Sequence, residues 1–142
     1  MDEEAKWTYL QLLDEELLKG GATMSEWSAF IAKECDYAFV AGANLATIVT
    51  AVAAIETYLR AEYADGRRIR LADLVDKSPI AQELRDDIHK LRRYRNNWVH
   101  VSSPEDDRLI LQSPEINDSE LENWAMLAQR TLRRTLYENQ WI

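Results

Sequence analysis

The longest uncharged run of the chain covers the 19 residues from Tyr37 to Ile55. A helix of this length could span a bilayer. Seven of its residues are alanine and one is glycine, however, and polar side chains interrupt the run at Asn44, Thr47 and Thr50. Because the run is only weakly apolar, we expect it to form the central buried helix of a helical bundle and not a membrane span.

Residues that interrupt helices are scarce, with four glycines and three prolines among 142 residues. The chain therefore has few places to turn, and its apolar side chains recur with the spacing of amphipathic helices. A chain of this length can bury a sizeable core without metal or disulfide support. We predict an all-α fold, in which a single domain over residues 1–142 forms an up-and-down bundle of four main helices plus a short helix.

Turn and capping signals divide the first part of the chain. The first helix is expected over residues 2–19, because Gly20 and Gly21 follow it and suit a helix C-terminus. Thr23 and Glu26 have the spacing of a capping box, which predicts that a second helix begins there.

The uncharged run is expected to continue into a long central helix that Asp65 and Gly66 close. Its glycine and alanines would let neighbouring helices approach closely. Glu56 lies at the edge of the packing row and has two candidate partners, namely Arg95 of another helix or Arg60 four residues along its own. The residues expected in the packing row are Leu45, Ile48, Val52, Ile55 and Leu59.

The next long helix carries many of the basic residues. We expect a short helical turn over residues 69–75, followed by a helix that Ser78 caps, with Pro79 in its first turn, and that ends near His100. One face of this helix carries the apolar residues Leu84, Ile88, Leu91 and Trp98. Arg95 lies on the same face, although charges are seldom buried without a partner or a function.

The segment over residues 101–118 contains two prolines and several acidic residues. We expect a loop here, with a short extended piece at residues 109–111. Asn117 and Glu120 have the spacing to cap a final helix. The residues expected in the buried row of that helix are Leu121, Trp124, Ala128, Leu132 and Leu136.

A row of polar side chains runs beside the apolar face of the predicted helix at residues 78–100. Asn96 and His100 share this row, and the long side chain of Arg95 can reach the same end of the helix. A planar guanidinium, an amide and an imidazole at one place suit phosphate binding and proton transfer. A cation in a last helical turn is also favoured by the helix dipole, so the informative feature is the apolar position of Arg95. The other members of the row, expected to bind phosphate, are Arg92, Arg85 and His89.

The charge and the missing motifs of the sequence argue against several classes of function. The net charge of −8 argues against broad binding to nucleic acid. Between Arg85 and His100, however, five basic residues face two acidic ones, which predicts one focused anion site. The sequence has no glycine-rich phosphate loop, no zinc-ligand spacing and no carboxylate cluster suited to magnesium, so we expect no metal and no cofactor.

Cysteine content and the N-terminus indicate the compartment. Cys35 is the only cysteine and lies in an apolar stretch, so we expect a packing residue and not a nucleophile. The N-terminus lacks the basic region and apolar core of a signal peptide. We therefore expect a cytoplasmic protein without membrane association.

The segment from Arg95 to His100 resembles the motif of the HEPN superfamily, in which four to six residues separate an arginine from a histidine. Asn96 matches the polar residue that usually follows the arginine, and the preceding residues 88–92 and the all-helical layout also look like that family. HEPN ribonucleases are usually homodimers whose two motifs line a shared cleft. The resemblance implies a metal-independent endoribonuclease that leaves 2′,3′-cyclic phosphate ends, with His100 handling protons, Arg95 stabilising the phosphate and Asn96 orienting one of them.

The chemistry of RNA cleavage agrees with a dimer. The reaction needs a base for the 2′-hydroxyl proton and an acid for the leaving 5′-oxygen, and one His100 cannot serve as both at once. A two-fold dimer would supply a second His100. Many proteins of the family are toxins restrained by an antitoxin, often a nucleotidyltransferase, and others act in phage defence, so the resemblance also implies such a partner.

A second hypothesis comes from a different class. The chain could be a catalytically silent helical dimerisation module that binds RNA, a nucleotide or a partner protein and uses Arg95 structurally. An intact set of Arg95, Asn96 and His100 favours the enzyme. A motif directed into a solid core would favour the module.

Overall fold

The computed structural model describes residues 1–65 and 67–142. Within them the chain forms seven α-helices and no strand, and 73% of it is helical, which confirms the all-α prediction. Five of these helices are long and two are short, so the bundle has one more of each kind than expected. The helices are α1 (Glu3–Leu17), α2 (Glu26–Val40), α3 (Asn44–Tyr63), α4 (Leu71–Lys77), α5 (Gln82–Val99), α6 (Arg108–Gln112) and α7 (Pro114–Leu136).

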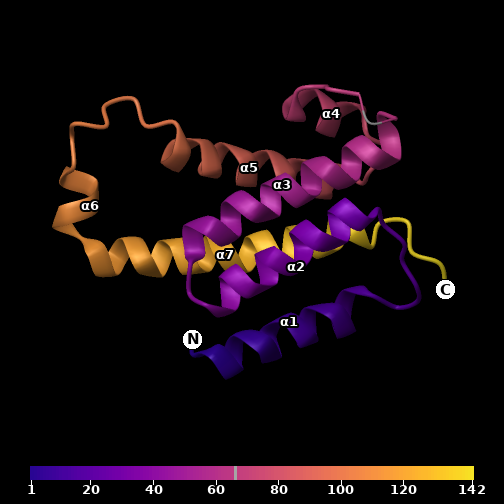
Figure 1. Ribbon diagram of the computed structural model, residues 1–142, viewed down its shortest axis with the longest axis horizontal. Coiled ribbons are helices and arrows are strands. Elements are labelled where there is room, and N and C mark those ends of the chain that lie inside the picture. Colours follow the sequence, from indigo (N-terminus) through magenta and orange to yellow (C-terminus); the bar gives the residue numbers. More distant parts are fainter. Residues whose placement is uncertain (66) are drawn as a thin grey trace.

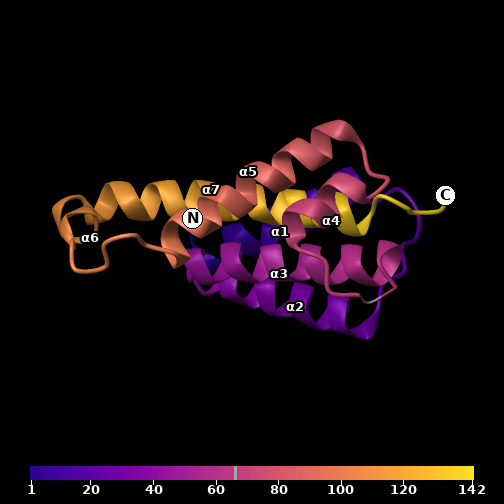
Figure 2. The ribbon, with the colours of Figure 1, turned by 90° about the horizontal axis from the view of Figure 1, so that it is seen from above.

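The helices pack around α3, which contacts α2, α4, α5 and α7 (Figure 1). On the other side of the molecule α1 packs against α2 and α7, while α5 lies against α3, α4 and α7. The short helix α6 contacts only α7. Together with the first turns of α7 it projects beyond the ends of the other long helices, as a second view shows (Figure 2). We call residues 101–116 the α6 arm.

The uncharged run is not one helix, contrary to the prediction. The chain turns between Val40 and Asn44, and Gly42 at the turn has a φ of +82°, a conformation that side chains with a Cβ rarely adopt. The run therefore consists of the end of α2, a turn and the first part of α3, and α2 and α3 pack against each other. Among the described residues, no helix combines the length and the apolar character that crossing a bilayer requires.

The core forms chiefly on α3 and α7. Leu45 is only half-buried, but the rest of the predicted α3 row is buried, namely Ile48, Val52, Ile55 and Leu59. On α7 the residues Ala128, Leu132 and Leu136 are buried, while Leu121 and Trp124 are half-buried. Cys35 is fully buried in this core, and its burial raises the pKa of its thiol. Both observations fit a packing residue.

Two helix starts differ from the prediction. Ser25, not Thr23, caps α2, since its Oγ accepts a hydrogen bond from the backbone N–H of Ser28 at 3.1 Å. Ser78 does not open the next helix. It ends α4, where its hydroxyl donates to the carbonyl of Leu74 at 2.6 Å, and α5 begins only at Gln82.

The chain on either side of α6 also differs from the prediction. Residues 109–111 are helical and not extended, as part of α6. The final helix begins at Pro114, which lies in its first turn, so Asn117 does not cap it. The side chain of Asn117 instead donates to the carbonyl of Leu109 and fastens α6 to α7.

The end of α1 is close to its predicted place. The helix ends at Leu17, and Gly20 and Gly21 follow. Gly21 exchanges two backbone hydrogen bonds with Trp141 near the C-terminus, and a Cβ on Gly20 would lie 1.8 Å from the carbonyl oxygen of Trp141. The glycines therefore allow close contact between the two ends of the chain. The predicted end of the central helix differs slightly, since α3 ends at Tyr63, and the part of that prediction that falls on Gly66 lies outside the described residues.

Candidate active site

Arg95 lies in the penultimate turn of α5, half-buried on the side that faces α3. Burial of the guanidinium lowers the pKa of Arg95, and the carboxylate of Glu56 opposes this shift while Arg92 adds to it. The Nε of Arg95 donates to Oδ1 of Asn96 at 2.9 Å. Within the described residues, its two terminal nitrogens have no hydrogen-bond partner and remain free for a ligand.

Glu56 pairs with Arg60, which is the second of the two predicted alternatives. The pair joins residues four apart on α3. No ion pair between Glu56 and Arg95 forms in the described part of the chain, although Glu56 is near enough for its charge to raise the pKa of Arg95. Glu56 therefore affects the pKa of Arg95 through its charge alone and does not occupy the terminal nitrogens of the guanidinium.

Asn96 and His100 complete the motif at the end of α5. Asn96 is half-buried, and its amide nitrogen makes no hydrogen bond within the described residues. His100 follows the last helical residue, and its backbone N–H donates to the carbonyl of Asn96 at 2.9 Å. The imidazole is exposed and forms no hydrogen bond to any described residue. His100 is thus directed toward solvent, whereas Arg95 and Asn96 are partly covered by the protein.

His89 and Arg92 form a separate polar chain with α4. The Nε2 of His89 lies 2.8 Å from Oδ1 of Asp76, and Nδ1 of His89 accepts a hydrogen bond from Nε of Arg92 at 3.1 Å. The proton of a neutral imidazole must then lie on Nε2. The hydrogen bond from His89 lowers the pKa of Asp76. His89 is about 16 Å of helix rise from His100, so it cannot act on the same atom.

Arg85 is held by backbone groups of the α4–α5 connection. Its guanidinium donates to three carbonyls, at 3.2 Å to Val75, 2.9 Å to Ser78 and 3.2 Å to Ile80. It lies about 22 Å of helix rise from His100. The structure therefore groups Arg95 and Asn96 with His100 just beyond them, has Arg92 near enough to influence Arg95, and places Arg85 far from the motif.

An aromatic contact that the sequence did not indicate fixes the last turns of α5. Tyr94 stacks on Trp124 of α7 with ring centroids 4.1 Å apart and planes 8° apart, and Trp98 packs beside Tyr94 at 6.4 Å. The hydroxyl of Tyr94 is buried and has no partner among the described residues. The spacing of four between Tyr94 and Trp98 was the available signal, but it did not show which helix the rings meet.

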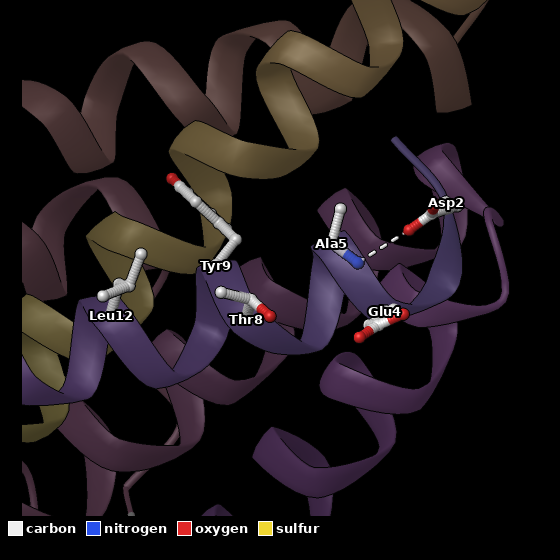
Figure 3. Close-up of a pocket in the computed structure, with 6 residues that line it drawn as sticks. All are labelled: Asp2, Glu4, Ala5, Thr8, Tyr9 and Leu12. Carbon is white, nitrogen blue, oxygen red and sulfur yellow. Dashed lines mark hydrogen bonds between the residues drawn. The ribbon is translucent and has the colours of Figure 1, made fainter.

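The stretch of sequence that contains the motif is basic. From Ile88 to Pro104 there is no acidic residue, whereas the same stretch contains four lysines or arginines and both histidines. By contrast, the hollow of about 420 Å³ drawn in Figure 3 lies on α1 and is lined by acidic and neutral residues. Its helix does not pack against α5. The basic end of α5 is therefore the better candidate for an anionic substrate.

The described residues contain no group of three or more His, Cys, Asp or Glu side chains that could hold a metal ion. The free groups at the end of α5 are instead a guanidinium fork, an amide and an imidazole, which suit phosphate binding and proton transfer. No family model, curated protein or solved structure matches the chain significantly.

Proposed function

We propose that this chain is a metal-independent endoribonuclease of the HEPN type that cuts RNA at the end of α5. One observation carries the proposal. The terminal nitrogens of Arg95, the amide nitrogen of Asn96 and the ring of His100 are free of partners among the described residues and lie in the last turns of one helix. For the half-buried Arg95 and Asn96 this is informative, because polar groups that the protein covers are usually hydrogen-bonded within it.

Each group has a step to perform. The 2′-oxygen of the RNA loses its proton to one imidazole and attacks the adjacent phosphorus, while the bond from phosphorus to the 5′-oxygen breaks and that oxygen receives a proton. The products are a 2′,3′-cyclic phosphate and a 5′-hydroxyl. Arg95 stabilises the negative charge on the phosphate oxygens with its terminal nitrogens, and Asn96 holds the guanidinium in position through its Oδ1.

The second proton transfer requires a second copy of the chain. A homodimer that brings two α5 ends together would place two His100 side chains at one cleft. The α6 arm supports this arrangement, because it begins directly after His100 and exposes apolar side chains that a partner would cover. The exposed apolar residues of this region are Val99, Val101, Leu109, Ile110, Leu111 and Ile116.

The proposed biological role follows from the resemblance. The enzyme would act in the cytoplasm as a toxin or phage-defence ribonuclease, restrained by an antitoxin of the nucleotidyltransferase type. An acidic chain with one basic site suits such control, since a partner need cover only the end of α5 to block cleavage.

A silent dimerisation module is the second candidate. The observation that favours it is the α6 arm itself, because an exposed apolar arm suits docking whether or not the motif reacts. In such a module Arg95 would bind RNA or a nucleotide without cleavage.

Cleavage of total cellular RNA in excess EDTA distinguishes the two. The wild type should cut RNA and leave cyclic-phosphate ends, whereas His100→Ala should abolish cleavage without unfolding, because the exposed imidazole contributes little to the core. Asn97→Ala is the matched control, since Asn97 is exposed beside the motif and outside its positions. A wild type that is inert until metal is added, or a His100→Ala variant that cuts equally well, would favour the silent module.

A further inference from the structure

Four large aromatic side chains are exposed on the face formed by α1 and α2. On α2, Trp27, Phe30 and Tyr37 are 71%, 49% and 52% exposed, and their spacing of three and seven places them on one side of the helix. On α1, Trp7 is 43% exposed and meets the ring of Tyr37 edge-on at 6.4 Å. We call these four residues the aromatic stripe.

The aromatic stripe has the dimensions of a helix-binding surface. Trp27 and Tyr37 are ten residues apart, which corresponds to about 15 Å along the helix axis, or nearly three turns. Trp27 and Phe30 meet edge-on at 6.2 Å and, with Glu26, line a surface hollow of about 340 Å³. Scattered apolar residues on a surface are ordinary, but these rings form two contacting pairs on one side of α2, Trp27 with Phe30 and Tyr37 with Trp7, as expected of a site for an amphipathic helix.

Unpaired carboxylates border the aromatic stripe. Glu3 and Glu4 precede Trp7 by one helical turn, Glu26 lies beside Trp27, and Glu34 lies between Phe30 and Tyr37 on the same side of α2. All four are exposed, and none forms an ion pair within the described residues. Among the described residues beside the aromatic stripe, the exposed basic side chain is that of Lys33, whose ammonium lies over the ring of Phe30.

The charge of the two helices is correspondingly negative. In α1 five acidic residues accompany one basic residue, and in α2 three accompany one, so that −6 of the chain's net charge of −8 lies on these two helices. Asp14 and Asp36 are paired with Arg133 of α7, and Glu16 with Arg130. The glutamates around the stripe are not balanced in this way.

We infer that the aromatic stripe binds an amphipathic helix of another protein, one that carries apolar side chains on one face and lysine or arginine beside them. The aromatic rings would cover the apolar face, and the four glutamates would pair with the flanking cations. Nucleic acid does not suit this surface, because its phosphates would meet the same glutamates. A second copy docked face to face is also disfavoured, because a two-fold axis would bring like charges together.

This inference does not depend on the proposed ribonuclease activity. The stripe belongs to α1 and α2, and neither helix carries a residue of the motif. The partner helix would therefore dock away from the end of α5, and its binding can be measured with a protein that is active or inactive toward RNA.

The test uses a labelled model peptide of about 14 residues, in which leucine and lysine follow helical spacing, and its glutamate counterpart. Fluorescence anisotropy should show saturable binding of the lysine peptide and none of the glutamate peptide. Trp27→Ala combined with Phe30→Ala should weaken binding by about tenfold or more. Leu12→Ala is the control at an exposed apolar position of α1 outside the aromatic stripe and should bind like the wild type.

Charge is tested separately, with circular dichroism to verify that every variant is folded. Glu26→Lys combined with Glu34→Lys should also weaken binding by about tenfold. Asp73→Lys combined with Glu83→Lys changes the net charge equally at exposed positions of α4 and α5, which do not pack against α1 or α2, and should have much less effect. Equal loss in both charge variants would show attraction to net charge alone and would overturn the inference.

Three further results would also overturn it. The first is failure of the lysine peptide to bind the wild type, and the second is unchanged binding by the Trp27→Ala and Phe30→Ala variant. The third is a different occupant. If the aromatic substitutions dissociate a homodimer in sedimentation, the occupant is a second copy of the chain. If they abolish flotation with phosphatidylcholine vesicles, the occupant is a membrane.

Discussion

Arg95 and Asn96 are joined through their side chains, with Nε of Arg95 donating to Oδ1 of Asn96 at 2.9 Å. Consecutive residues of a helix project about 100° apart, so this bond draws the guanidinium away from the apolar face toward the row that contains Asn96 and His100. One side of the guanidinium is thereby fixed, and its terminal nitrogens remain free within the described residues. The pair explains how an arginine on the apolar face can serve a site at the helix end.

Arg95→Lys should lower RNA cleavage by about 100-fold, because lysine keeps the charge but loses both the fork and the bond to Asn96. Folding should survive, since Arg95 is only half-buried. Cleavage rates at equal concentrations of folded protein provide the measurement. Arg93→Lys is the matched control, because Arg93 is exposed two residues away. Near-normal cleavage by Arg95→Lys would mean that the fork does not hold the phosphate.

Arg85→Ala should act on stability and not on cleavage. The substitution removes the side-chain donor from the carbonyls of three buried residues, Val75, Ser78 and Ile80, of which only that of Ser78 is known to keep another donor, the backbone N–H of Ile80. The loss should be about 1–3 kcal/mol in urea unfolding. Lys90→Ala removes the same charge from an exposed position of α5 and should leave stability almost unchanged. If Arg85→Ala instead has the same free energy of unfolding as the wild type and binds RNA more weakly, Arg85 contacts phosphate, as expected from its position in the polar row.

The structure explains why some elements were predictable and others were not. The helical periodicity of α5 and α7 is strong, and the buried residues Leu84, Ile88 and Leu91 follow it. The turn at Gly42 was missed because it lies among alanines, which continue a helix readily, so that Gly42 and Asn44 alone did not indicate that the helix ends. A short apolar run such as residues 109–111 fits a strand or a helix equally well, and only packing decides.

In the candidate site, too, the positions of some residues were predictable from the sequence and the partners of others were not. Residue order on one helix was enough to place Asn96 and His100 on a common row. The hydrogen-bond partners of Arg85 and His89 could not be predicted from the sequence. They belong to α4 and its connection to α5, and they depend on how the two helices meet. Serine signals were equally ambiguous, since the hydroxyl of Ser78 can cap the helix before it or the helix after it.

Tyr58 should make the fold sensitive to alkali. Burial, reinforced by the charge of Glu62, raises the pKa of Tyr58 from 10.0 to about 12. The unfolded phenol ionises first, so the stabilisation is complete below about pH 10 and is lost as the pH rises through about 12. The loss attributable to Tyr58 should reach up to about 3 kcal/mol. Tyr58→Phe should therefore reduce the difference in unfolding free energy between about pH 9 and pH 12, whereas Tyr37→Phe, at an exposed position, should not.

The α6 arm should hold the homodimer together. Light scattering at micromolar concentration should report twice the chain mass of 16.5 kDa. Leu111 and Ile116 are each 68% exposed on the arm, so glutamate at both positions would place charge in the interface without disturbing the core. This double variant should be monomeric and folded. It should also lose cleavage, because each chain then has only one His100 to offer.

Leu12→Glu is the control for this experiment, since Leu12 is 57% exposed on α1, far from the arm in sequence. It should remain dimeric and active. A dimer that persists in the arm variant would place the interface elsewhere on the molecule. A wild type that is monomeric yet cleaves RNA would instead mean that one chain supplies both proton transfers. The second proton-transfer group would then not be His89, because His89 is about 16 Å of helix rise from His100.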